Sequence, residues 1–189
     1  MKPENILLDG EGHIRLTDFG LSKTGIFKTE EDMTYTICGT PEYLAPEIVR
    51  GEGHGKAVDW WSLGALLYEM QCGRPPHQNN NKMQLLYTIA TKKIDFTRIH
   101  KASEEFLNLL RRLLTHTPLK RIGGSDTGAE EIKKHPFFYG VDWEVVGRKE
   151  MMPPFKPKIT DEKDTANIDR AYLGERPIDS PVANPLTNS

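Results

Sequence analysis

The sequence predicts a mainly α-helical domain that carries one short β-hairpin near its start and ends in an extended tail. Apolar residues recur at helical spacing between about residues 59 and 134. Two short apolar runs close to the N-terminus flank residues that favour a turn. Prolines are frequent after residue 139, where no period is sustained. With 189 residues, 37% hydrophobic and 28% charged, the composition is that of an ordinary globular domain.

The expected hairpin comes first along the chain. Its strands are Ile6-Leu7-Leu8 and Ile14–Thr17. The residues between them, Asp9-Gly10-Glu11-Gly12, are of types that favour a turn. Residues 25–57 are rich in Thr, Gly and Pro without a period, which predicts a long loop. Loops of that length inside a compact domain are usually functional or disordered.

A helical pattern begins at Asp59 and ends before Gly73 and Pro75. Its apolar residues cover most of the helix circumference, which is typical of a buried central helix. They are Trp60, Trp61, Leu63, Leu66, Leu67 and Met70.

Three more helices are expected after the central one. They span residues 82–92, a segment that Ser103 caps, and residues 129–134. Ser103 is a favourable N-cap, and the acidic Glu104 and Glu105 complement the helix dipole in the first turn.

Composition also bears on the classes of binding partner and on the cellular compartment that the sequence predicts. The formal net charge of −2 lacks the basic surplus of a nucleic-acid binder, so no nucleic-acid partner is expected. The longest apolar stretches, such as Leu63–Tyr68, are too short to span a membrane, and the polar first residues do not form a targeting peptide. Cys38 and Cys72 make neither a zinc pair nor a disulfide framework, which favours a cytoplasmic or nuclear setting.

Chemistry-bearing motifs occur in a specific order. Lys2-Pro3-Glu4-Asn5 precedes Asp18-Phe19-Gly20 by one hairpin, and Gly39–Tyr43 and Ala45-Pro46-Glu47 follow. The ordered set matches the second half of the general protein-kinase signature. A hairpin brings its two ends together, so the Asn5 amide and the Asp18 carboxylate could face one Mg²⁺, which prefers oxygen ligands. Lys2 adds a positive charge suited to a phosphoryl group.

The chain resembles the C-lobe and C-terminal tail of an AGC-group serine/threonine protein kinase, nearest the ribosomal-protein-kinase and Akt-like branches. The residues that carry the resemblance are Thr36–Glu47, Ala57–Gly64 and Pro153–Pro157. It implies a protein-kinase-like C-lobe portion without the N-lobe over residues 1–138 and an AGC-kinase tail over residues 139–189.

The resemblance also implies roles for single residues. Glu4, Asn5 and Asp18 belong to the ATP site, and Asn5 and Asp18 hold Mg²⁺. Lys2 contacts the γ-phosphate and Thr40 orients Lys2. An upstream kinase would phosphorylate Thr36, whose phosphate would pair with cations that include Lys23; Ser180 resembles a second phosphosite.

The resemblance also implies specificity roles for two residues and structural roles for three. Glu4 and Glu69 would read basic residues that precede the target Ser or Thr in protein substrates. Glu47 and Arg121 would form a buried ion pair, and Asp59 would hold the catalytic loop at a helix start. His77 stands where the group usually has Phe, which removes an apolar anchor.

The catalytic-loop aspartate, the Gly-rich loop and the β3 lysine of a complete kinase do not occur in these 189 residues. Phosphoryl transfer depends almost wholly on positioning and electrostatics, so the chain alone is expected to be inactive. One alternative interpretation is a non-catalytic scaffold or decoy that uses the surface of this lobe. A third, a pseudogene product, predicts that no stable protein forms. The retained Asn5, Asp18 and Thr36 favour the enzyme, because a scaffold has no physical need for metal ligands or a phosphosite.

Overall fold

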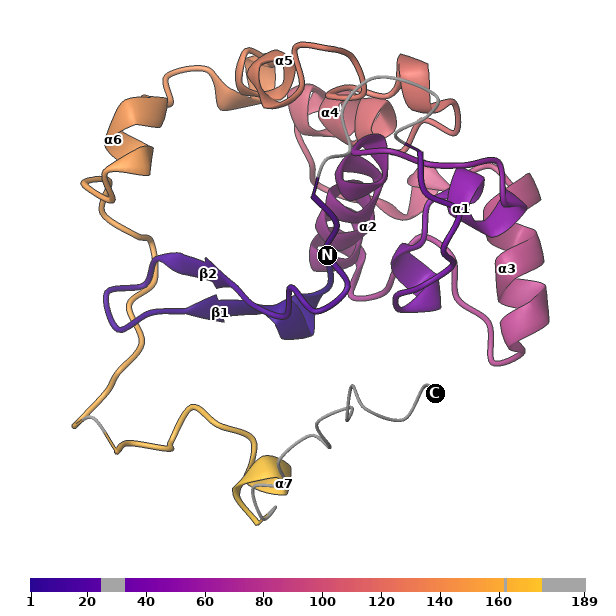
Figure 1. Cartoon of the computed structure of the whole chain (residues 1–189). Coiled ribbons are helices and arrows are strands. Elements are labelled where there is room, and N and C mark those ends of the chain that lie inside the picture. Colours follow the sequence, from indigo (N-terminus) through magenta and orange to yellow (C-terminus); the bar gives the residue numbers. More distant parts are fainter. Residues whose placement is uncertain (25–32, 162, 175–189) are drawn as a thin grey trace, which may run out of the picture. The chain divides into compact units, whose positions relative to one another are not determined.

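The computed structural model describes residues 1–24, 33–161 and 163–174. The chain forms two compact units, of which the first comprises Met1–Leu7 and Ile14–Met152 and the second Leu8–His13 and Pro153–Ser189. The first unit holds nearly all the described helices (Figure 1). Over the described ranges, the expectation of a mainly helical chain with one hairpin is confirmed.

The hairpin pairs β1 (Ile6–Leu8) with β2 (Ile14–Leu16). Its turn is stabilised by Asp9, whose carboxylate accepts hydrogen bonds from the backbone N–H groups of Glu11 (3.2 Å) and His13 (2.9 Å). Past the strands, the backbone N–H of Thr17 donates to the carbonyl of Asn5 at 3.0 Å. This bond brings the residue after Thr17, Asp18, close to Asn5.

The long loop expected over residues 25–57 is interrupted by a helix, so that expectation was wrong for part of the segment. The helix α1 (Pro46–Arg50) has proline at its first position and Gly51 in the left-handed conformation (φ 67°) at its end. Proline is favourable there because the first N–H of a helix has no intrahelical partner. Five residues are too few to show a period in the sequence.

The central helix α2 (Ala57–Cys72) is confirmed as a core element, and Gly73 ends it in the left-handed conformation (φ 71°). Trp61, Ala65 and Tyr68 are buried among residues of α1, of the 94–99 segment and of α4 (Glu104–Leu113). Met70 differs from the expectation, since 74% of it is exposed in the last turn.

The packing of α2 on α4 depends on Gly64. A Cβ atom at Gly64 would lie 2.9 Å from the Cβ of Leu113 and 2.9 Å from the Cγ of Leu114, well inside normal contact distance. The N-cap of α4 is the expected one, since the Ser103 hydroxyl accepts from the N–H of Phe106 at 3.1 Å.

The other predicted helices are α3 (Lys82–Thr91), which packs on α1, and α5 (Ala129–Lys133). Two helices, α6 (Trp143–Gly147) and α7 (Arg170–Leu173), lie in the segment expected to be extended. Asp142 caps the start of α6, because its carboxylate accepts hydrogen bonds from the N–H groups of Glu144 and Val145. Among the helices of the described ranges, none combines the length and apolar character needed to cross a bilayer.

A buried ion pair joins segments that are distant in sequence. The Arg121 guanidinium donates to both carboxylate oxygens of Glu47, at 2.7 and 2.9 Å. It also donates to the carbonyls of Ala57 (2.8 Å) and Thr115 (2.9 Å). Its carbon lies 5.2 Å from the centre of the Trp61 ring. One side chain therefore ties together α1, the start of α2 and the chain after α4.

We predict that Arg121→Ala destabilises the fold, because it leaves the Glu47 carboxylate buried and unpaired. The expected loss in the free energy of unfolding is about 3–5 kcal/mol, measured by chemical denaturation. Arg112→Ala is the control, since Arg112 pairs with Glu131 (2.7 Å) while 45% of its side chain is exposed, and its expected cost is about 1 kcal/mol or less. Equal losses for both variants would contradict the prediction.

A second prediction concerns His77, which is buried and whose Nε2 has no hydrogen-bond partner. Burial, with a smaller contribution from the nearby His116, lowers the pKa of His77 to about 4. Because the unfolded chain binds this proton more readily, stability falls as the pH drops below about 6.5 and continues to fall towards about 4. Over the whole range from about pH 6.5 to about pH 4, the free energy of unfolding should fall by about 3 kcal/mol.

His77→Phe should remove this share of the acid sensitivity, because phenylalanine has no group that takes up a proton. The measurement is the free energy of unfolding at several pH values between 7 and 4, compared between wild type and variant. His100→Gln is the control, because His100 is exposed. A pH dependence that is the same for wild type and His77→Phe would contradict the assignment.

Candidate functional site

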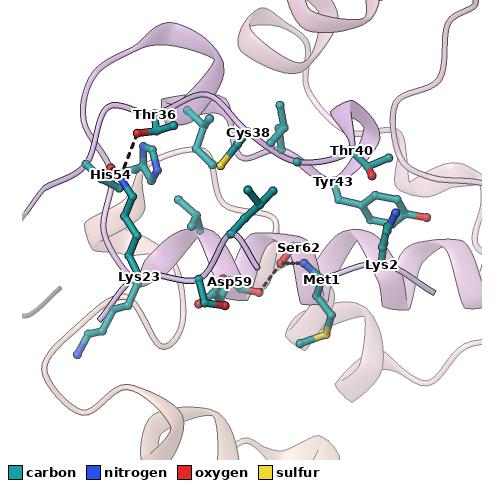
Figure 2. Close-up of a pocket in the computed structure, with 18 of the residues that line it drawn as sticks. Met1, Lys2, Lys23, Thr36, Cys38, Thr40, Tyr43, His54, Asp59 and Ser62 are labelled. Atoms are coloured by element: carbon teal, nitrogen blue, oxygen red, sulfur yellow. Dashed lines mark hydrogen bonds between the residues drawn. The ribbon is translucent and has the colours of Figure 1, made fainter. Parts of the chain in front are cut away.

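A cavity of about 770 Å³ in the first unit gathers the chain start, the segment after β2, residues 34–44 and the beginning of α2 (Figure 2). Lys2, Asn5, Asp18, Thr36, Thr40 and Asp59, which were singled out in the sequence, all line it, as does Lys23. Residues separated by up to 61 positions in sequence, from Met1 to Ser62, thus face one space.

Asn5 and Asp18 form the oxygen-rich part of the cavity wall. The Asn5 side-chain nitrogen lies 3.4 Å from an Asp18 carboxylate oxygen, so both side chains point to the same place. Asp18 adopts a left-handed backbone conformation (φ 60°), which non-glycine residues rarely take and which is often found at functional sites. The surrounding chain therefore holds this carboxylate in a defined direction.

The donor set fits Mg²⁺. In the described ranges no group of three or more His, Cys, Asp or Glu side chains could hold a metal ion. Mg²⁺ does not need such a group, because it keeps several waters and usually takes one or two carboxylates plus phosphate oxygens. Half a turn of the Asn5 amide would present its oxygen beside Asp18.

Lys2 and Thr40 lie on the wall of the same cavity, and each is half-buried. Close by, the Met1 amino group donates to the Ser62 hydroxyl at 3.2 Å, and this hydroxyl donates to the carbonyl of Asp59 at 2.9 Å (Figure 2). Burial raises the pKa of Asp59, and the positive amino group opposes that shift. The first turn of α2 therefore faces the start of the chain.

Thr36 lies within reach of a cation. The Lys23 ammonium donates to the Thr36 hydroxyl at 3.0 Å and also to the hydroxyl of Thr34 (Figure 2). The side chain of Thr36 is exposed, so a modifying enzyme can reach it. A phosphate attached to the Thr36 hydroxyl would therefore lie next to the positive charge of Lys23.

Glu69 accepts a hydrogen bond from the hydroxyl of Tyr43. Burial raises the pKa of Tyr43 above its usual range, and the negative charges of Glu69, Glu4 and Glu42 reinforce the shift. Three carboxylates therefore act on the surroundings of this one tyrosine. Such a surface favours cations.

Some of the singled-out residues are not in the cavity. Glu47 and Arg121 form the buried pair described above, which is architectural, and Ser180 lies outside the described residues. Two functional residues were not recognised from the sequence. They are Tyr43, which donates a hydrogen bond to Glu69, and His54, which lines the cavity beside Lys23. Tyr43 is part of the quoted Gly39–Tyr43 motif, but no signal in the sequence indicates that a histidine 18 positions after Thr36 shares its cavity.

Comparison with known proteins gives consistent matches. The family described as protein kinase domain matches residues 1–138. "Protein kinase 2" of Dictyostelium discoideum is 50% identical over 96% of this chain. "Serine/threonine-protein kinase gad8" of Schizosaccharomyces pombe is 48% identical over 97%, and "Ribosomal protein S6 kinase alpha-2" of Homo sapiens is 43% identical over 100%.

These relatives are much longer than the region they share with this chain. The match covers 36% of the Dictyostelium protein, 31% of the yeast protein and 25% of the human protein. The chain thus spans between a quarter and about a third of their lengths.

Proposed function

The chain belongs to the protein kinase family, in its AGC group of serine/threonine kinases, and from this premise we propose that it supplies the metal-binding and substrate-reading part of an enzyme that phosphorylates Ser and Thr in proteins. The observation that carries the proposal is the single cavity that Lys2, Asn5, Asp18, Thr36 and Thr40 all line. The proposed cosubstrate is ATP with Mg²⁺.

In this proposal Asn5 and Asp18 hold Mg²⁺, and Lys2 contacts the γ-phosphate. The metal ion would neutralise charge that develops on the transferred phosphoryl group. Thr40 would orient Lys2 through its hydroxyl. Each of these residues acts by position and charge, which is what phosphoryl transfer chiefly requires.

Regulation is proposed to act through Thr36. Phosphorylation by an upstream kinase would add about −1.5 to −2 charge at pH 7 to a hydroxyl that already receives a hydrogen bond from Lys23. The resulting ion pair would fix Thr36 to Lys23 on the wall of the cavity. We propose a cytoplasmic or nuclear setting, where the free thiols of Cys38 and Cys72 stay reduced.

The proposed substrates carry basic residues before the target Ser or Thr. The support is the negative field around Tyr43, to which Glu4, Glu42 and Glu69 contribute. An arginine guanidinium is suited to such a surface because it makes bidentate, charge-assisted hydrogen bonds with carboxylates.

The test of activity uses the chain joined at residue 1 to the N-terminal part of the kinase domain of Dictyostelium protein kinase 2, since the chain alone is expected to give no turnover. The fusion should transfer phosphate from Mg-ATP to a basic Ser-containing peptide. Asp18→Ala should lower kcat at least about a hundredfold, a loss of about 3 kcal/mol of transition-state stabilisation. Asp126→Ala, at an exposed loop position, is the matched control.

Turnover that Asp18→Ala leaves unchanged would contradict the assigned role. A folded fusion without any turnover would favour the scaffold interpretation instead. Thermal unfolding of each variant separates loss of chemistry from loss of the fold.

A separate prediction tests the proposed preference for substrates that carry a basic residue before the target serine. Glu69→Gln in the fusion should raise KM about tenfold for a peptide with arginine before the serine, as expected from the loss of one charge-assisted pair worth about 1.4 kcal/mol. KM for the same peptide with alanine in place of arginine should change little. Tyr43→Phe is the control, because it removes the hydrogen bond to Glu69 but keeps the carboxylate. Equal effects of Glu69→Gln on both peptides would refute the substrate-reading role.

A further inference from the structure

His54 is held beside the phosphosite segment by backbone pairing. Thr34 and His54 form an isolated antiparallel bridge, with N–O distances of 3.0 and 2.9 Å. Gly53 makes this approach possible, since its φ is 78° and a Cβ atom there would lie 3.0 Å from the Tyr35 ring and 3.1 Å from the Met33 sulfur. The register of residues 53–54 against 33–35 is therefore set by the backbone.

The His54 ring lies next to the Lys23–Thr36 pair. Figure 2 shows the imidazole beside the Lys23 ammonium and the Thr36 hydroxyl, and all three residues line the cavity. Thr34 also receives a hydrogen bond from Lys23. A group added to the Thr36 hydroxyl would therefore meet one ammonium and one imidazole.

The charged groups that act on His54 are Glu47 of α1 and Lys23. Partial burial lowers the pKa of His54, Glu47 opposes the shift, and the Lys23 charge adds to it. With an unmodified Thr36, the imidazole is consequently neutral near pH 7. A phosphate of about −1.5 to −2 charge would offset Lys23 and favour the imidazolium form.

We propose that His54 is a second ligand of the phosphate on Thr36, which it binds as imidazolium together with Lys23. The inference rests on the proposed phosphorylation of Thr36 and specifies how that modification is held. When the phosphate is added, His54 takes up one proton from the solvent. The two cations then donate to different oxygens of the same phosphate.

A regulatory consequence follows from the chemistry of histidine. Lysine side chains in general keep their positive charge throughout the physiological pH range, whereas an imidazole loses its proton within that range. The phosphate should therefore be held more tightly in mildly acidic conditions than in alkaline ones. The stability of the form phosphorylated on Thr36 therefore depends on pH through His54, which is not one of the residues proposed to bind Mg²⁺ or the γ-phosphate.

The first experiment titrates imidazoles by NMR in two forms of the full chain, one with threonine and one with phosphothreonine incorporated at position 36 during synthesis. We expect the His54 midpoint to rise by about one unit or more, a tenfold gain in proton affinity, when the phosphate is present. The exposed His100 in the same chain is the internal control. An unchanged His54 midpoint would overturn the proposal.

The second experiment follows phosphate removal by a phosphatase in wild type, His54→Gln and Lys23→Met. His54→Gln should lose phosphate several-fold faster than wild type at pH 6.5 and at nearly the same rate at pH 8.5. Lys23→Met should be faster at both pH values. A His54→Gln rate equal to wild type at pH 6.5, or a difference that is independent of pH, would overturn the proposal.

The wild-type titration needs no substitution, so an unfolded His54→Gln variant would not prevent a decision. Neither experiment uses kinase turnover or an upstream kinase. A negative result here is therefore distinguishable from a failure of the proposed phosphotransferase activity.

Discussion

The ion pair between Glu47 and Arg121 is the interaction on which the site most depends. The guanidinium has five donors in a rigid fork, and four hydrogen bonds from it go to Glu47, Ala57 and Thr115. Glu47 lies in α1 and Ala57 begins α2. The short segment between these two anchors contains Gly53 and His54, so its ends are held by a pair that lies outside the cavity.

The residues that stabilise the core are therefore different from those that line the cavity. The buried pair and the α2–α4 packing use apolar and fully paired groups, which gives a rigid base. The cavity wall instead carries charged side chains of both signs, with cations at Lys2 and Lys23 and a carboxylate at Asp18. Charges of this kind are suited to a phosphate and a metal ion, because their interactions strengthen when such a group displaces water.

Local signals in the sequence account for much of the fold. The turn at Asp9–Gly12, the Ser103 cap and the left-handed Gly73 each act within a few residues, so their effects are readable without knowing the tertiary structure. The short helices α1 and α6 were missed, since five residues each carry too little periodicity. Their formation depends on a starting proline and on the Asp142 cap. The exposure of Met70 was missed as well, because the helical pattern does not reveal which turns other elements cover.

The same division applies to the candidate site. The order of the motifs around Lys2, Asn5, Asp18 and Thr36 determined the family, because each motif needs a particular residue type at a particular place along the chain. Only the tertiary structure decided that Tyr43 binds Glu69 and that His54 lies beside Lys23 and Thr36. Those contacts join positions far apart in sequence, and they form only after the core has set the distance between their backbones. The sequence specifies the chemistry of each side chain. Which other side chain it contacts depends on how the rest of the protein packs.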